Sequence, residues 1–121
     1  MRYHVLIIED DSPLRELYAL YLKRGNISSS AAPTAEQALR VLGTESFDAV
    51  LVDVNLGSGM SGLDFIEIMQ QNPDFDHIKV IILTSFPEPF ELSSTLRIDL
   101  SINKPVNYAN LIKALDSVMD S

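Results

Sequence analysis

The chain has 121 residues, of which 46% are hydrophobic, and its formal net charge is −8 at neutral pH. This length suits one domain with a single hydrophobic core, while the acidic balance argues against direct binding of nucleic acid or of an anionic membrane. The sequence has no cysteine, which excludes disulfides and thiolate zinc sites, and it has neither a secretory signal nor an apolar run of membrane-spanning length, so we expect a cytoplasmic protein.

Five short apolar runs alternate with amphipathic helical patterns along the chain. The runs lie at residues 3–8, 27–31, 49–52, 78–83 and 100–102, and three of them are rich in Val, Ile and Leu on both faces. Such alternation is typical of βα repeats, in which helices cover both faces of a parallel sheet. We therefore predict an α/β fold with a doubly wound, five-stranded parallel sheet.

The first two helices have recognisable start signals. Ser12 precedes a proline in the first helical turn and is expected to be the N-cap of a helix that ends at Gly25. Thr34 and Gln37 have the spacing of a capping box at the start of the second helix. Apolar residues at helical spacing follow both signals, so each helix is expected to bury one face.

The later helices are less regular. We expect one at about residues 62–71 and the last at about 107–119, each with an apolar face. Between them, Pro87 and Pro89 lie where another helix should begin, and they leave only residues 90–96 for it. This fourth helix is therefore predicted to be short or displaced.

Polar side chains follow four of the five runs at the point where each predicted strand ends. Open α/β sheets bind ligands in the crevice beyond the carboxyl ends of their strands, so these side chains are expected to share one pocket. Carboxylates, hydroxyls and an ammonium would meet there. The residues are Glu9, Asp10 and Asp11 after the first run, Asp53 at the third, Thr84 and Ser85 at the fourth, and Lys104 with Pro105 after the fifth.

This group of side chains has the composition of a phosphoryl-accepting site. Packed carboxylates repel one another unless a raised pKa or a cation relieves the repulsion, and ligation by oxygen atoms alone matches Mg²⁺. A carboxylate there can attack a phosphoryl group and form an acyl phosphate, while an ammonium and a hydroxyl stabilise the phosphoryl oxygens. Taken singly, acids after a strand often only cap a helix, and a Lys-Pro pair often lies in a loop. The occurrence of all these side chains together, at the ends of four predicted strands, favours the phosphoryl-accepting site.

Four segments carry motifs that are specific in combination. They are VLIIEDDSPLR at 5–15, LVDVNL at 51–56 with SGLD at 61–64, IILTS at 81–85, and NKP at 103–105. With these motifs, the sequence from Tyr3 to Met119 resembles the receiver domain of two-component response regulators.

The resemblance implies a phosphoacceptor, a Mg²⁺ site and two contacts to the phosphoryl oxygens. The donor would be a phosphohistidine on a sensor histidine kinase or a phosphotransfer protein, and a downstream protein that the sequence does not identify would read the result. By position, Asp53 would be the acceptor, Asp10 and Asp53 direct Mg²⁺ ligands, Glu9 a ligand through water, Asn55 a ligand through its backbone carbonyl, and Thr84 and Lys104 the phosphoryl contacts.

The resemblance also implies a flavodoxin-like strand order, 2-1-3-4-5, and favours a cis peptide between Lys104 and Pro105. It predicts a single receiver domain over residues 1–121, without an output domain. Such a domain assists its own phosphorylation and dephosphorylation and does not turn over a substrate as an enzyme does.

Two positions depart from the family pattern, and a third lies where family members adjust the access of water. Gly57 stands where proline is usual, in a loop that is one residue longer than usual. Ser101 replaces the usual Tyr or Phe, which rotates on phosphorylation, so we expect an altered readout of phosphorylation. Phe86 is bulky at a position that controls access of water, so we expect a long-lived phosphorylated state.

Other functions on the same fold remain as alternatives. The first is a protein-interaction module that works independently of phosphorylation. The retention of all the site positions argues against it. The second is a flavodoxin-like cofactor binder, which needs a phosphate-binding loop where this chain has three acids. The third is a phosphatase of the haloacid dehalogenase type, which carries a second acid where this chain has Asn55.

Overall fold

A five-stranded parallel sheet lies at the centre of the molecule. The computed structural model describes residues 2–57, 59–85 and 96–120. Its strands run in the order β2-β1-β3-β4-β5, and every pair of neighbours is parallel. Their bounds are β1 His4–Ile8, β2 Ser28–Ala32, β3 Ala49–Asp53, β4 Lys79–Thr84 and β5 Leu100–Asn103. The fold class and the strand order are therefore as predicted.

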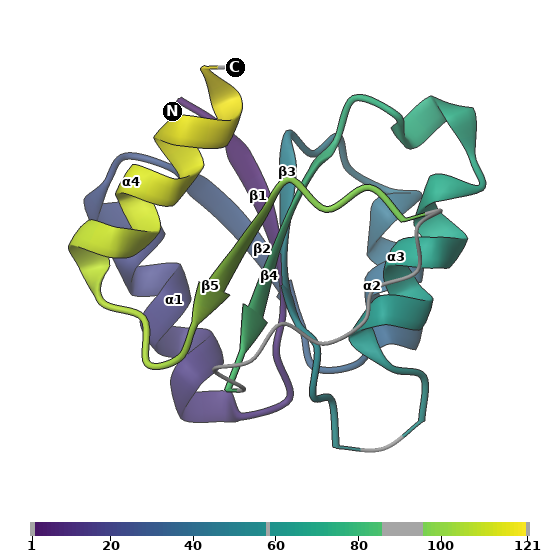
Figure 1. The fold of residues 1–121 in the computed structure, drawn as a ribbon, viewed down its shortest axis with the longest axis horizontal. Coiled ribbons are helices and arrows are strands. Elements are labelled where there is room, and N and C mark those ends of the chain that lie inside the picture. Colours follow the sequence, from purple (N-terminus) through teal and green to yellow (C-terminus); the bar gives the residue numbers. More distant parts are fainter. Residues whose placement is uncertain (1, 58, 86–95, 121) are drawn as a thin grey trace.

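Helices cover both faces of the sheet, α1 and α4 on one side and α2 and α3 on the other (Figure 1). Their bounds are α1 Ser12–Arg24, α2 Ala35–Leu42, α3 Gly62–Gln70 and α4 Tyr108–Met119, with a short 3-10 helix at Pro73–Phe75. Of the helix expected at 90–96, all but Leu96 lies outside the described residues, and Leu96 itself is not helical. Among the helices that the structure describes, none has the length and apolar character needed to span a membrane.

The helix starts follow local capping chemistry, with one correction to the sequence analysis. Helix α1 is capped by Asp11, whose side chain accepts a hydrogen bond from the Leu14 N–H, and not by Ser12, which is already helical. A carboxylate favours this position because it also complements the positive end of the helix dipole. Thr34 caps α2 as predicted, and a complete capping box is formed by Ser61 and Asp64 at α3.

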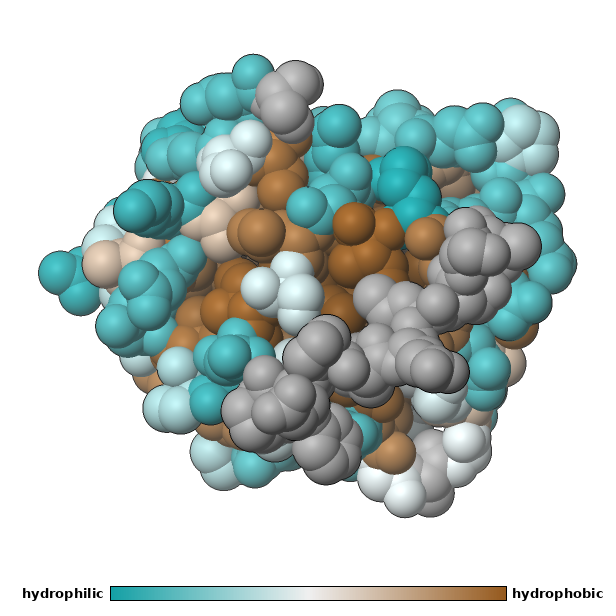
Figure 2. Space-filling view, in the orientation of Figure 1, coloured by the Kyte–Doolittle hydropathy of each residue, from teal (hydrophilic) through white to brown (hydrophobic). Residues whose placement is uncertain are grey.

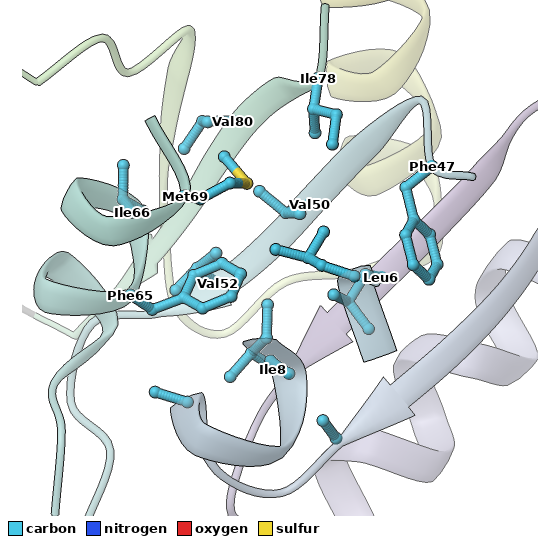
Figure 3. Close-up of a cluster of buried hydrophobic side chains, with 14 of the residues drawn as sticks. Leu6, Ile8, Phe47, Val50, Val52, Phe65, Ile66, Met69, Ile78 and Val80 are labelled. Atoms are coloured by element: carbon cyan, nitrogen blue, oxygen red, sulfur yellow. The ribbon is translucent and has the colours of Figure 1, made fainter. Parts of the chain in front are cut away.

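Each face of the sheet has its own hydrophobic core, because successive strand residues point to opposite sides. In β1, Leu6 and Ile8 face α2 and α3, whereas Val5 and Ile7 face α1 and α4. Figure 3 shows the first core, in which side chains of α3 lie over the strands. The main chain at the carboxyl ends of the central strands is thereby held between two packed layers.

Strand β5 forms one edge of the sheet, and its residues alternate between partly buried and exposed. Figure 2 shows the molecule in the orientation of Figure 1, with hydrophobic residues gathered in the middle of the visible face, where β5 lies. Leu100 and Ile102 line a shallow groove of about 310 Å³ there, together with Ala114 of α4. Ser101, expected to change the readout of phosphorylation, is exposed on this strand, and Phe86 lies outside the described residues.

A polar clamp fixes the segment that leads into β5. The Arg97 N–H donates to Gln70 Oε1 at 2.9 Å, and Gln70 Nε2 donates to the Arg97 carbonyl at 2.6 Å. The Arg97 guanidinium also donates to the Ile78 carbonyl at 2.8 Å and pairs with Asp99. Asp99 in turn accepts from the Val80 N–H of β4 at 2.7 Å. The entry to β5 is therefore tied to both α3 and β4.

Candidate functional site

Three carboxylates converge at the carboxyl ends of β1 and β3. Glu9 and Asp10 follow β1, Asp53 is the last residue of β3, and these two strands are paired neighbours. One ligand oxygen from each of the three residues lies within 4.8 Å of the others. The sequence analysis predicted this convergence, and strand register produces it.

One ammonium holds the two buried members of this acid cluster. Lys104 Nζ lies 3.0 Å from Glu9 Oε1 and 3.1 Å from Asp53 Oδ2. The side chains of Glu9 and Asp53 are 1% and 3% exposed, while that of Lys104 is 17% exposed. Lys104 is positioned by its backbone, whose N–H donates to the Thr84 carbonyl at 2.8 Å, and the peptide between it and Pro105 is cis, as expected.

The burial of these charges perturbs their protonation. Burial raises the pKa of Glu9 from 4.5 to about 7, and a hydrogen bond with Asp53 adds to the rise while the Lys104 ammonium opposes it. Burial lowers the pKa of Lys104, but its hydrogen bonds to Glu9 and Asp53 outweigh this effect and the net direction is upward. Glu9 is therefore only partly protonated near neutral pH.

Thr84 and Asn55 lie beside Asp53, as expected. Thr84 is the last residue of β4, 3% exposed, and the preceding Leu83 is the register partner of Asp53. The Asn55 N–H donates to Asp53 Oδ1 at 2.9 Å. The Asp53 carboxylate is thus held through both oxygens, by the Asn55 amide on one side and by the Lys104 ammonium on the other.

Some contacts of the site were not predicted. The Gly57 N–H donates to Asp10 Oδ2 at 2.7 Å, and Arg15 Nη1 donates to the Glu9 carbonyl at 3.0 Å. A glycine amide carries no side-chain signal in a sequence, and Arg15 alone reads as a solvent-facing residue on a helix. Asp11, to which the resemblance gives no role, contacts Glu9 Oε2 through its backbone N–H at 3.3 Å while its side chain caps α1.

An apolar groove of about 470 Å³ adjoins the acid cluster. It is lined by Leu14, Leu17, Tyr18 and Tyr21 of α1, by Ser85, and by Lys104, Pro105 and Val106. Lys104 belongs both to this groove and to the acid cluster, so the groove lies next to Glu9 and Asp53.

The residues present fit a divalent cation. All the donor atoms are oxygens, the class of ligand that Mg²⁺ prefers. When all three acids are ionised, three carboxylates and one ammonium leave a formal charge of −2. A doubly charged cation would neutralise that charge, which burial makes costly.

The sequence matches the family model described as the response regulator receiver domain over residues 5–116. It is 28% identical to the phosphate regulon transcriptional regulatory protein PhoB of Klebsiella pneumoniae, over 98% of this chain and 52% of that protein. It is 38% identical to the heme response regulator HssR of Staphylococcus saprophyticus, over 66% of this chain and 34% of that protein. The chain therefore spans about half and about a third of the length of these curated relatives.

Solved structures agree on the fold. The chemotaxis response regulator CheY4 of Vibrio cholerae superposes with a TM-score of 0.89, covering 98% of this chain and 99% of that one at 22% identity. At this level of identity the likeness shows the fold alone.

Proposed function

The chain belongs to the receiver domain family of response regulators, the signalling domains of two-component systems, and on this basis we propose that it accepts a phosphoryl group on Asp53. The donor is a phosphohistidine of a sensor histidine kinase or a phosphotransfer protein. We propose that residues 1–121 form one receiver domain, that it is cytoplasmic, and that it reacts stoichiometrically without turning over a substrate.

The observation that carries the proposal is the setting of the Asp53 carboxylate. Oδ1 accepts from the Asn55 N–H at 2.9 Å and Oδ2 lies 3.1 Å from Lys104 Nζ, so the group is fixed in orientation. In the transfer, a carboxylate oxygen forms a bond to phosphorus while the phosphorus–nitrogen bond of the donor breaks. The electron pair of that bond stays on the imidazole nitrogen. Lys104 and the Thr84 hydroxyl would stabilise the phosphoryl oxygens.

Receiver domains bind Mg²⁺ at an acidic pocket, and we propose that the acid cluster is this pocket here. Glu9, Asp10, Asp53 and the backbone carbonyl of Asn55 would hold the ion. When bound, it would supply positive charge against the phosphoryl oxygens. Without such a cation, each negative charge brought by the phosphoryl group would add to that of the buried carboxylates.

The proposed test is intact mass after incubation with acetyl phosphate, with Mg²⁺ or with chelator. We expect a Mg²⁺-dependent phosphoryl adduct on the wild type that is absent from Asp53→Asn. Asp11→Asn is the matched control, because asparagine is an equally good N-cap and Asp11 lies outside the proposed acceptor set. An adduct that persists in Asp53→Asn would refute the assignment, and an unmodified wild type would favour the phosphorylation-independent interaction module.

The donor protein is proposed to dock on the apolar groove beside Lys104. Leu17→Glu would place a charge in this groove without touching the acid cluster. We expect transfer from a phosphorylated histidine kinase to slow while phosphorylation by acetyl phosphate is unchanged. Equal loss with both donors would show that the groove does not serve docking.

A further inference from the structure

The segment that follows β3 reaches back to the acid cluster through one backbone amide. The Gly57 N–H donates to Asp10 Oδ2 at 2.7 Å, across 47 positions of sequence. Among the described residues, this is the hydrogen bond that the structure gives to the Asp10 side chain. It links the Asp10 carboxylate directly to the segment between β3 and α3.

Asp10 needs such a restraint more than the other two acids do. Glu9 and Asp53 are buried and held by Lys104, whereas Asp10 is exposed. An exposed carboxylate samples several rotamers, and a ligand that must be ordered when the metal binds weakens the binding. The Gly57 amide occupies one oxygen of Asp10 and leaves the other available to a cation.

The contact requires glycine for a steric reason. A Cβ built on Gly57 would lie 2.7 Å from Asp10 Oδ2, closer than real Cβ contacts come, so any side chain at this position would displace the carboxylate. The Gly57 backbone is outside the left-handed region, unlike Gly59 with a φ of 74°, so alanine at 57 would not strain the main chain. Proline would in addition remove the donating N–H.

We propose that Gly57 is a positioning residue for the divalent cation, acting through Asp10. The inference rests on the proposed function, because it assumes that the acid cluster binds Mg²⁺. Groups that orient a metal ligand commonly change affinity by roughly 10-fold to 100-fold when they are lost.

The test is the Mg²⁺ dissociation constant, measured by titrating MgCl₂ and following amide chemical shifts of the unphosphorylated protein. We expect Gly57→Ala to bind Mg²⁺ roughly 10-fold more weakly than the wild type. Gly43→Ala is the matched control, because a Cβ there would make an ordinary 3.6 Å contact with the Arg40 carbonyl, remote from the acids. Urea unfolding of each variant verifies that it is folded under the titration conditions.

A double-mutant cycle separates this role from a general effect on the fold. In an Asp10→Ala background, Gly57→Ala should change Mg²⁺ affinity by less than twofold, because the residue through which Gly57 acts is gone. Equal affinity of the wild type and Gly57→Ala, or the same loss in both backgrounds, would overturn the inference. A wild type that binds no Mg²⁺ would instead overturn the proposed metal site, so the two failures are distinguishable.

Discussion

Replacing Glu9 by glutamine should stabilise the metal-free protein by about 3 kcal/mol at pH 8 and by only about 1 kcal/mol at pH 5. In the folded state the pKa of Glu9 is raised from 4.5 to about 7, which corresponds to about 3 kcal/mol between the two protonation states. Since the folded state binds this proton more tightly than the unfolded state, its contribution is complete below pH 4.5. It is lost as the pH rises to about 7. Glutamine is neutral throughout and avoids that loss.

The assay is urea unfolding in EDTA at pH 5, 6, 7 and 8, with Glu16→Gln on the exposed side of α1 as a control for charge removal. The two histidines also titrate in this range, but they are common to all variants and cancel in the difference. The difference in free energy of unfolding between Glu9→Gln and the wild type should increase from pH 5 to pH 7 and then level off. Stability curves that stay parallel over this range would refute the reasoning.

Three further substitutions test the packing of the site and its surroundings by urea unfolding. Lys104→Met should cost on the order of 3 kcal/mol at pH 8 and less at pH 5, because two buried carboxylates lose their counter-ion; an equal cost at both values would contradict this. Gly62→Ala should cost about 2 kcal/mol or more, since its Cβ would press on the main chain at the end of β3, whereas Gly43→Ala should be nearly neutral. Gln70→Ala should cost about 1 kcal/mol by removing both hydrogen bonds to the Arg97 backbone, and no change would show that this clamp is not needed.

The sequence predicted those parts of the molecule that depend on local pattern and on strand order. Apolar runs bounded by polar residues placed all five strands to within two residues at either end, because buried parallel strands need apolar side chains on both faces. The acid cluster followed, since residues at the carboxyl ends of neighbouring strands must meet. The Thr34 cap was readable because capping is a contact over three residues.

Contacts made by main-chain atoms over long sequence distances could not be predicted in this way. The Gly57 amide and the Arg97–Gln70 clamp join segments 47 and 27 residues apart, and no residue type marks either partner. The sequence analysis placed the N-cap of α1 one residue late, because Asp11 and Ser12 are adjacent and both are good N-cap residues. The pKa of Glu9 likewise depends on burial, which a single sequence position does not reveal.

The acid cluster and its neighbours come from the ends of four strands that are adjacent in the sheet, β1, β3, β4 and β5. The proposed metal ligands, however, come only from the ends of β1 and β3, whereas Thr84 ends β4 and Lys104 follows β5. A cation bound there would be lost when β1 and β3 separate, and its binding free energy would oppose that opening. Amide hydrogen exchange in these two strands should therefore slow when Mg²⁺ is added, so that a ligand at one end of the sheet stabilises the pairing of two neighbouring strands along their length.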